Sequence, residues 1–440
     1  MVKGGNPMSM NVSRLIDALL WRVARAGRGM RSCAAFLWRR MMFRTTFIAV
    51  SGSVGKTTTK ELLRVILASH APTTATVATV NHRKTGGPEA VLLGVRPWHR
   101  YAVIEAGVER PGDMASVIKL LKPDVGVMLD VKRCHMMMFR TMEALADEKA
   151  DLVRNLRRRS RAILNLDNPY VADMADVAPC EVVGFGTGDS ARVKLLEARS
   201  RWPERLTLRI AVDGEAYEVR TRLVGTHWAT AVLAALTTAL TCGVPLDAAI
   251  ASVGQVEPFW ARMQPITLPG SGAVVIRDEW NGSIDTFEAA FKVMEEASAE
   301  RKILVLSDYS DTSTKLRGRA NHLGRRGAGI ADLLVFVGDY AERSVAAAMD
   351  EGMGKDNARA FVTMAAAAEF LRAELSAGDL LLLKGQSNHH LTRVYLALLG
   401  EVTCTTVSCS RQILCDRCPR SGMAWNPRLQ TLVAAPDSRV

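Results

Sequence analysis

The feature that most constrains this chain is the stretch of residues 46–67, which reads as a strand, a glycine-rich turn and a helix. Residues 47–50 are short, apolar and partly β-branched, as expected of a buried parallel strand. A glycine-containing turn and the start of a helix follow: Gly52-Ser53-Val54-Gly55 and Lys56-Thr57-Thr58-Thr59. Backbone N–H groups of such a loop, together with the helix N-terminus, bind anions. The pattern predicts a phosphate-binding loop in which Lys56 contacts the outer phosphates of a nucleotide and Thr57 coordinates Mg²⁺.

Length and composition favour an ordinary water-soluble protein of several domains. A chain of 440 residues is too long for one core and predicts two or three domains. Eight cysteines in this length do not make a disulfide scaffold. We see no signal peptide with a cleavage site and no apolar run long enough to span a bilayer. The expected location is the cytoplasm.

Arginine is concentrated ahead of the phosphate loop, and the formal net charge of the chain is +12. The arginines of residues 11–44 are Arg14, Arg22, Arg25, Arg28, Arg31, Arg39, Arg40 and Arg44. They alternate with apolar residues at roughly helical spacing, and Trp21 and Trp38 lie among them. One interpretation is an amphipathic segment in peripheral contact with an anionic membrane or an anionic acceptor. The other is a pair of helices that dock on the following domain. Nucleic acid is not an expected partner, because no nucleic-acid-binding module is visible.

The order of apolar segments predicts two α/β units. Strands expected at residues 47–50, 101–105, 125–130 and 162–165 alternate with helices, which is typical of a parallel sheet. Residues 192–223 look like antiparallel strands, with a hairpin signal at Asp213-Gly214. A second, smaller α/β unit begins near residue 257, with strands at 274–276, 303–306, 333–337 and 380–383. The predicted division is a basic segment 1–45, a central domain 46–256, a Rossmann-like domain 257–403 and a cysteine-containing tail 404–440.

Three residues beyond the loop are candidates for chemistry. Glu105 ends an expected strand, His135 follows another, and Lys149 lies on an expected helix. The carboxyl ends of parallel strands meet at one edge of the sheet, so Glu105 and His135 are expected beside the phosphates. Carboxylate and imidazole ligands there suit Mg²⁺ or Mn²⁺. Taken singly, each is more often a surface or core residue, and only the set as a whole indicates a site.

Motifs in a fixed order resemble those of the Mur ligases. The first are SGSVGKTTTKELL, NHRKTGGP from Asn81, Glu105-Ala106-Gly107, His135 with Phe139, and Glu148-Lys149. Later matches are Gly225-Thr226-His227, Arg262, Asp278-Glu279-Trp280-Asn281, Leu306-Ser307-Asp308, His322 and Lys384-Gly385. The likeness runs from about residue 46 to residue 400.

The resemblance implies an ATP-dependent ligase of cell-wall or cell-envelope synthesis. In this family a substrate carboxylate is phosphorylated by ATP, and an amine then attacks the acyl phosphate to form an amide. The matched lysine, Lys149, is carbamylated in the family and helps to hold magnesium. The implied metal ligands are Thr57, Glu105, His135 and Lys149. The implied phosphate grip is Gly52, Ser53, Val54, Gly55, Lys56, Thr57 and Thr58. Asp278 and Asn281 match residues near the adenosine, and Arg262 matches a residue that senses the nucleotide.

Departures from the family pattern motivate an alternative. The family's first domain, which binds a uridine-diphosphate sugar, is expected to be missing, because few residues precede the loop. Other differences are Asn81-His82-Arg83-Lys84, Arg277, Trp280, Gly282-Ser283-Ile284 and Gln386-Ser387. The alternative is therefore an ATP-binding, membrane-associated relative that has lost ligase activity.

Four cysteines lie close together near the carboxyl end: Cys404, Cys409, Cys415 and Cys418. Four thiolates are a usual set for structural zinc. Their spacing is not that of standard zinc fingers, so free thiols are the alternative.

Overall fold

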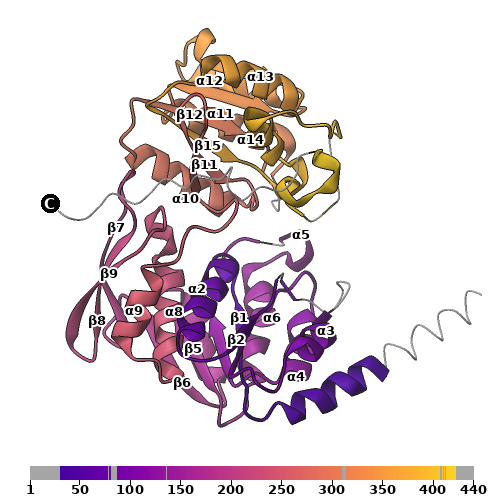
Figure 1. The fold of residues 1–440 in the computed structure, drawn as a ribbon, viewed down its shortest axis with the longest axis vertical. Coiled ribbons are helices and arrows are strands. Elements are labelled where there is room, and N and C mark those ends of the chain that lie inside the picture. The colour runs from indigo at the N-terminus through magenta and orange to yellow at the C-terminus, as the bar shows by residue number, and fades with distance from the viewer. Residues whose placement is uncertain are drawn as a thin grey trace, which may run out of the picture.

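The computed structural model describes residues 30–77, 79–80, 87–134, 136–309, 314–406, 409, 411 and 413–422. Two α/β bodies are stacked along the long axis of the molecule (Figure 1). The lower body holds a nine-stranded sheet and the upper body a six-stranded sheet, counted over the described residues. The predicted fold class is confirmed by this architecture.

The lower sheet has the order β2-β3-β1-β4-β5-β6-β7-β8-β9. Pairings from β2 across to β7 are parallel, and those of β7 with β8 and β8 with β9 are antiparallel. Its strands are β1 (Thr46–Ser51), β2 (Thr73–Ala75), β3 (Tyr101–Glu105), β4 (Val125–Met128), β5 (Arg161–Asn165), β6 (Glu181–Gly186), β7 (Val193–Arg199), β8 (Thr207–Val212) and β9 (Glu215–Arg220). Its helices are α2 (Lys56–Ala68), α3 (Gly87–Gly94), α4 (Asp113–Leu121), α5 (Met136–Phe139), α6 (Met142–Arg154), α7 (Pro169–Ala172), α8 (Ala229–Thr241) and α9 (Leu246–Val253).

Strand β1 lies in the middle of this sheet and is buried on both faces. Ile48 and Val50 join a core that includes residues of α2 and α8, whereas Phe47 and Ala49 join a second core with residues of α4 and α6. A continuous apolar run is what such a two-sided position requires. The predicted hairpin at Asp213-Gly214 is present, and both residues have positive φ, as a tight β-hairpin turn demands.

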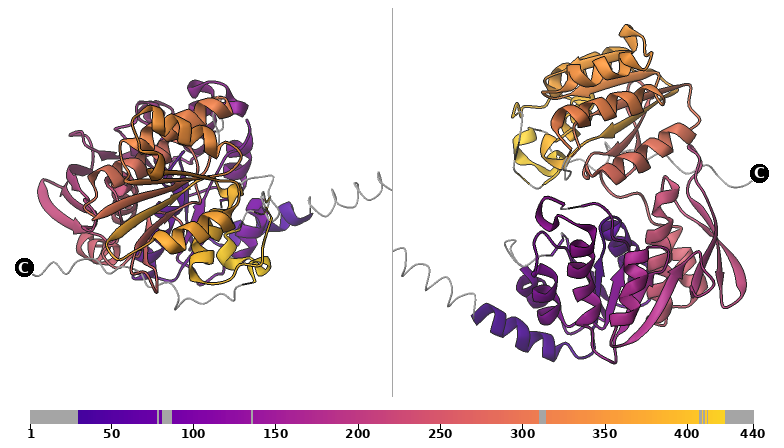
Figure 2. Two further views of the ribbon diagram at one scale, coloured as in Figure 1. Left: turned by 90° about the horizontal axis from the view of Figure 1, so that it is seen from above. Right: turned by 180° about the vertical axis from the view of Figure 1, so that it is seen from behind.

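The upper sheet has the order β10-β11-β15-β12-β13-β14, and only the β10–β11 pairing is antiparallel among its described strands. Its strands are β10 (Gln264–Thr267), β11 (Val274–Asp278), β12 (Arg301–Leu306), β13 (Leu333–Val337), β14 (Ala358–Phe361) and β15 (Asp379–Lys384). Its helices are α10 (Ile284–Glu296), α11 (Leu316–Ala328), α12 (Ala341–Asp350), α13 (Met364–Glu374) and α14 (Thr392–Leu399). Residues of α10, α11 and α12 join one core and residues of α13 and α14 join another, so helices cover both faces, as Figure 2 shows from two further sides.

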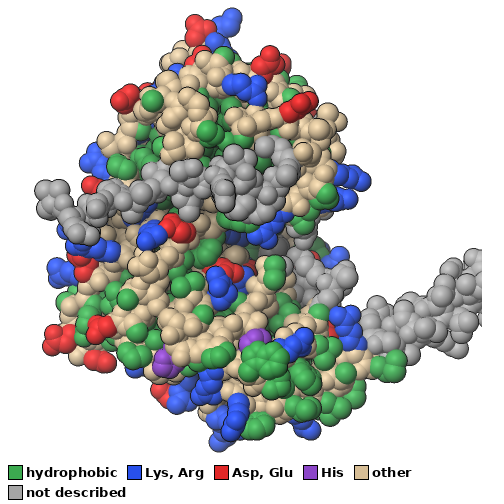
Figure 3. Space-filling view, viewed as in Figure 1, with side chains coloured by type: hydrophobic (Ala, Val, Ile, Leu, Met, Phe, Trp, Pro, Cys, Tyr) green, Lys and Arg blue, Asp and Glu red, His purple; other side chains and the backbone are tan. Residues whose placement is uncertain are grey.

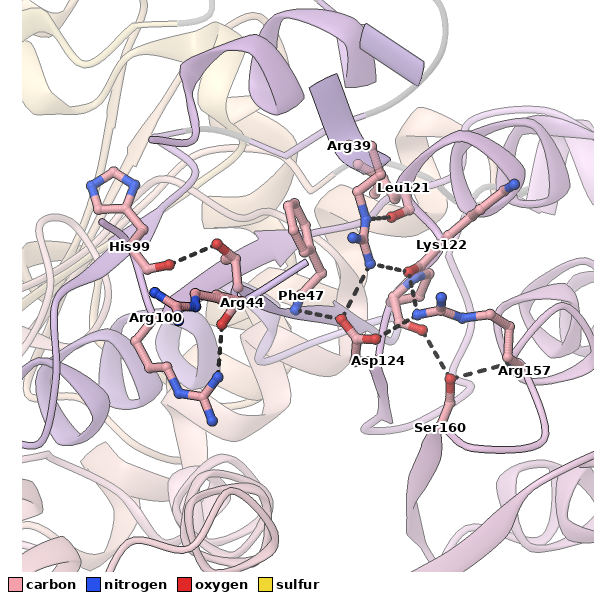
Figure 4. Close-up of polar contacts among 12 residues, drawn as sticks. Arg39, Arg44, Phe47, His99, Arg100, Leu121, Lys122, Asp124, Arg157 and Ser160 are labelled. Atoms are coloured by element: carbon pink, nitrogen blue, oxygen red, sulfur yellow. Dashed lines mark hydrogen bonds and ion pairs between the residues drawn. The ribbon is translucent and has the colours of Figure 1, made fainter. Parts of the chain in front are cut away.

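A helix over residues 30–41 precedes β1 and docks on the lower body. Arg39 donates to the carbonyls of Leu121 and Lys122, each at 2.7 Å, and pairs with Asp124 at 3.2 Å (Figure 4). Trp38 Nε1 donates to the carbonyl of Val95 at 2.9 Å. Docking is therefore confirmed for residues 30–41; residues 11–29 lie outside the described part of the chain. No described helix is both long and apolar enough to cross a bilayer.

Candidate active site

The loop between β1 and α2 is built around two glycines. Gly52 and Gly55 have φ of +152° and +80°. A Cβ on Gly52 would lie 2.9 Å from Leu129 Cβ, so a side chain there would displace the neighbouring strand end. Gly55 precedes Lys56 at the first turn of α2. The loop thus brings its backbone and the helix N-terminus to the carboxyl edge of the sheet, where parallel α/β folds bind ligands.

Asp130, two residues beyond β4, organises the backbone of this loop. Its Oδ1 accepts hydrogen bonds from Ser53 N at 2.8 Å and Val54 N at 3.0 Å. The sequence placed Asp130 at the end of an expected strand but gave it no role. Its position after the strand that pairs with β1 was the available signal, because the carboxyl ends of paired parallel strands lie together.

Two lysines contact the same loop carbonyl. Lys56 Nζ donates to Gly52 O at 2.8 Å, and Lys149 Nζ donates to it at 3.0 Å. Lys149 lies on α6, whose first turn is capped by the Thr141 side chain accepting from Ala144 N. Only 2% of Lys149 is exposed, and burial lowers its pKa from 10.5 to about 8. About a tenth of Lys149 is therefore neutral at pH 7, far more than for an ordinary surface lysine.

A second cluster joins the first turn of α2 to β3. The carboxylate of Glu105 accepts from Thr57 Oγ1 at 3.0 Å and from Thr79 Oγ1 at 2.6 Å. Glu105 is buried, and its Oε2 lies 4.0 Å from the ammonium of Lys60. The structure thus brings Thr57 and Glu105 together, as the sequence predicted, and adds Thr79 and Lys60 to them.

Arg262 reaches this cluster from the segment that leads into β10. Its Nη2 donates to Thr57 Oγ1 at 3.3 Å. The residues on either side of it, Ala261 and Met263, have positive φ of 51° and 48°, which is strained for side chains of this type. Gln264 Oε1 and Asp278 Oδ1 hold this backbone by accepting from Ala261 N and Met263 N. The strained backbone projects Arg262 across the gap between the two bodies.

Asp278, at the end of β11, lies at the facing edge of the upper body. Lys384 Nζ contacts Asp278 Oδ2 at 2.6 Å and the carbonyl of Asn281 at 2.6 Å. Asp278 and Asn281 line a pocket between the bodies together with Arg262, Val54, Gly55 and Asp130. His227 also lines this pocket, and burial lowers its pKa to about 3, so its ring is neutral. Lys384 was recognised only as part of a motif, and its link to Asp278 depends on the pairing of β11 with β15.

Several predicted positions do not enter this geometry. His135 and the Asn81–Lys84 segment lie outside the described residues. Thr58 is buried, and its Oγ1 has no hydrogen-bond partner among the described residues.

The described cysteines do not form a metal site: no group of three or more His, Cys, Asp or Glu side chains in the described ranges is arranged to hold an ion. Cys415 Sγ instead lies 3.3 Å from His390 Nδ1.

Arg277, which departs from the family pattern, is part of the core rather than of the pocket. It is fully buried and pairs with Glu279 at 2.5 Å and with Asp416 at 2.6 Å. Its guanidinium lies 4.3 Å from the ring centre of Tyr395. The cation at this position is balanced by two carboxylates, so the substitution is explained by an ion network.

The residues of the loop fit a nucleotide triphosphate with Mg²⁺. A cradle that admits no Cβ at Gly52, a lysine at the helix start and a buried hydroxyl of Thr58 with no described partner suit phosphate oxygens. Thr57 and Glu105 supply the oxygen donors that Mg²⁺ prefers. Fold and site therefore define a two-domain protein that binds a nucleoside triphosphate between a phosphate-loop domain and a second α/β domain.

Comparisons with known proteins agree with this class. The family model of the Mur ligase middle domain matches residues 50–239, and that of the Mur ligase, glutamate ligase domain matches residues 261–387. A UDP-N-acetylmuramoyl-tripeptide–D-alanyl-D-alanine ligase from Mycobacterium tuberculosis is 30% identical over 387 residues, covering 82% of this chain and 74% of the relative. The corresponding Escherichia coli ligase is 24% identical over 356 residues, covering 80% of this chain and 77% of the relative.

Solved structures give the same result. MurF from Acinetobacter baumannii matches with a TM-score of 0.76 and 25% identity, covering 84% of this chain and 80% of that one. A MurF ligase from Thermotoga maritima in complex with ADP shares the fold, with a TM-score of 0.69 and 20% identity over 84% of this chain and 83% of that one. The chain belongs to the Mur ligase family, and it is an ATP-dependent peptide ligase of the kind that acts in peptidoglycan synthesis. The relatives above are D-alanyl-D-alanine-adding ligases.

Proposed function

We propose that this chain joins the carboxylate of a peptide acceptor to an amino-group donor, with D-alanyl-D-alanine as the first donor to test. The observation that carries the proposal is a contact between the two domains at the first turn of α2, directly after the phosphate loop. There Thr57 contacts both Glu105 of the lower body and Arg262 from the segment before β10. The names of the relatives support the substrates, since they specify a UDP-N-acetylmuramoyl-tripeptide and D-alanyl-D-alanine.

The reaction has two steps that balance without a further reactant. An acceptor carboxylate oxygen attacks the γ-phosphorus of ATP, the bond to the β,γ-bridging oxygen breaks, and ADP leaves. The donor amine then attacks the acyl carbon, inorganic phosphate leaves, and the amine gives up a proton as the amide forms. Positioning and charge stabilisation dominate such phosphoryl transfers, and excluding water protects the acyl phosphate.

We assign the roles of the side chains as follows. Lys56 neutralises charge on the transferring phosphoryl group, as lysines of phosphate loops do. The Mg²⁺ ligands are Thr57, Glu105, His135 and a carbamylated Lys149, with Mg²⁺ offsetting phosphate charge when bound. The low pKa of Lys149 supports this role, because only the neutral amine reacts with carbon dioxide. The phosphate grip comprises residues 52–58, Asp278 and Asn281 contact the adenosine, and Arg262 reports that the nucleotide is bound.

We also propose a division of the chain at residues 45, 256 and 403. The two sheets, which span β1 to β9 and β10 to β15, support the middle boundary. The proposed location is the cytoplasm, with peripheral contact of residues 11–44 with an anionic membrane or an anionic acceptor. The arginines of residues 30–44 and their lack of acidic neighbours in the sequence support this contact.

The test is ADP release measured over a panel of acceptors and amines, in the wild-type chain and in Lys149→Ala. We expect ADP release to require both substrates and to fall by about two orders of magnitude or more in the variant, since a metal ligand is lost. Lys119→Ala, on the exposed surface of α4, is the matched control and should keep full activity. ADP release that is unaffected by Lys149→Ala would contradict the proposal. ATP binding without turnover over the whole panel would favour a relative that has lost ligation.

A further inference from the structure

The helix over residues 30–41 has two opposite apolar faces. One face, with Ala35, is buried against the lower body, as is Met42 just beyond the helix. Arg39 on the same side is held by the carbonyls of Leu121 and Lys122. On a helix packed against a domain, the opposite face is normally polar. The outer face of this helix is not.

The outer apolar residues form one stripe along the helix: Met30, Ala34, Leu37 and Met41. At about 100° per residue their directions fall within about 60° of one another. Met30, Leu37 and Met41 are 70%, 55% and 61% exposed, so the large side chains of the stripe have little protein contact. Phe43, just beyond the helix, is 81% exposed. Scattered apolar side chains on a surface are ordinary, but a continuous stripe usually marks an interaction site.

Cations border this stripe on both sides. At about 100° per residue, Arg31 and Arg40 point to opposite flanks of it, and Arg44 follows Phe43. The sequence from residue 30 to residue 44 contains no aspartate or glutamate. An apolar stripe with an arginine on each side is typical of helices that lie in the interface of an anionic bilayer.

The loop after α3 lies against the helix region. It is tied to the helix region because Trp38 donates to Val95 O and Arg100 donates to Arg44 O at 2.7 Å. The loop carries Trp98, which is 66% exposed, between the exposed Arg96 and Arg100. Figure 3 shows hydrophobic side chains gathered with Lys and Arg at the lower right of the molecule, in the region of this helix. Tryptophan beside arginine is typical of the membrane–water interface.

We propose that helix 30–41, Phe43 and Trp98 form a surface that binds an anionic lipid bilayer, and we call it the lipid-facing surface. This deepens the peripheral contact proposed above by choosing the membrane over a free anionic acceptor. A soluble anion needs only the arginines, whereas a bilayer also buries the apolar stripe between them.

The position of this surface leaves the active site open. The helix pairs with Asp124 at the amino end of β4 and leads through Thr45 into the amino end of β1, while the phosphate loop follows the carboxyl end of β1. The six residues of β1 separate the two edges by about 20 Å. In Figures 1 and 2 the helix lies at the end of the lower body away from the upper body. A bilayer there would contact the molecule on the side opposite the gap between the domains.

The test is co-sedimentation of the full chain with vesicles of phosphatidylcholine alone or mixed with phosphatidylglycerol. We expect binding to the mixed vesicles and weak binding to the neutral ones. Leu37→Glu and Met41→Glu place carboxylates in the stripe, and each should weaken binding to the mixed vesicles about ten-fold or more. Both positions are exposed, so both variants should keep the melting temperature and the ADP release of the wild type in solution.

The matched control is Met349→Glu, which changes an exposed methionine on α12 of the upper body. It should bind the mixed vesicles like the wild type. Equal binding by Met41→Glu and Met349→Glu would overturn the lipid-facing surface, as would equal binding of the wild type to neutral and mixed vesicles. Binding to a soluble polyanion without binding to vesicles would also overturn it, in favour of an anionic acceptor. ADP release is measured without vesicles, so failure of this inference is distinguishable from failure of the ligase proposal.

Discussion

At the scale of single residues, Lys149 shows how burial changes what a lysine can do. The same side chain on the surface of α6 would be protonated and solvated, as most helical lysines are. Here it lies against Gly52 O with 2% of its surface exposed, and its pKa falls to about 8. The protein keeps a buried amine next to the phosphate loop although this position opposes folding.

The unfavourable burial of Lys149 leads to a prediction about the free energy of unfolding. Lowering the pKa of Lys149 from 10.5 to about 8 corresponds to about 3 kcal/mol against the folded state at neutral pH. Between about pH 8 and pH 10.5 the unfolded chain binds more protons at Lys149 than the folded chain does. The free energy of unfolding of the wild type should therefore rise with pH over this range. We expect Lys149→Met to abolish ligation but to raise the free energy of unfolding by about 1–3 kcal/mol at pH 7. Urea unfolding at pH 7 and pH 9 measures this, and the advantage over the wild type should shrink by about 1 kcal/mol at pH 9.

Lys119→Met is the control for this comparison because Lys119 is exposed on α4. It should change the free energy of unfolding by less than about 0.5 kcal/mol at either pH. A Lys149→Met variant that is less stable than the wild type at pH 7 would show that the buried ammonium is fully compensated by its neighbours.

At the scale of elements, the short helix η5 (Cys415–Arg417) connects the end of the described chain to β11. Asp416 accepts from Arg277 at 2.6 and 3.0 Å, and both side chains are buried. The guanidinium of Arg417 lies 3.7 Å from the ring centre of Trp260, in the segment between the two bodies. This short helix lies beyond residue 387, where the family match ends. Through Asp416, η5 thus supplies one of the two carboxylates that balance Arg277 from outside the matched domain.

Removing that carboxylate should be costly. We expect Asp416→Ala to lower the free energy of unfolding by about 3–5 kcal/mol, because it leaves a buried guanidinium short of one partner. Asp356→Ala is the control: its side chain is 95% exposed in a pair with Arg359, and it should cost less than about 1 kcal/mol. The triple variant Arg277→Met/Glu279→Gln/Asp416→Leu should recover most of the loss, since it removes all three charges of the network. Thermal and urea unfolding distinguish these cases; equal effects of Asp416→Ala and Asp356→Ala would contradict the network.

At the scale of the whole molecule, Arg262 connects the two bodies at the nucleotide site. Arg262 lies between two residues with positive φ, and its side chain contacts Thr57 on α2 of the lower body. Strain of this kind persists where the surroundings hold it, and it is often found at hinges and switches. The arrangement suits a closure that depends on both domains.

We predict that Arg262→Ala lowers kcat/KM for ATP by about ten- to a hundred-fold, because positioning across the gap is lost. Arg262→Lys should recover only part of the loss, since lysine cannot reproduce the guanidinium geometry. Arg209→Ala, exposed on β8, is the control. Steady-state ADP release over a range of ATP concentrations measures kcat and KM separately. An unchanged kcat/KM in Arg262→Ala would show that the contact with Thr57 has no part in the reaction.

The sequence by itself determined the features that depend on neighbouring residues. The apolar run of residues 47–50, the glycines at 52 and 55, and Lys56-Thr57 specify a strand, loop and helix locally, so the phosphate loop could be placed in advance. The alternation of strands and helices indicated two α/β units. Placing Glu105 at a strand end also indicated its meeting with Thr57, because parallel strands share one carboxyl edge.

Tertiary structure decided the features that join distant parts of the chain. Asp130 lies 77 residues from Ser53, and Asp416 lies 139 residues from Arg277. No local pattern predicts such contacts, because they depend on strand register and on how the ends of elements pack. Burial of Lys149, and with it the lowered pKa, likewise follows from the packing of α6 against the loop. For residues 30–41 the sequence left docking and membrane contact as alternatives; packing buries one side of the helix and leaves an apolar stripe on the other.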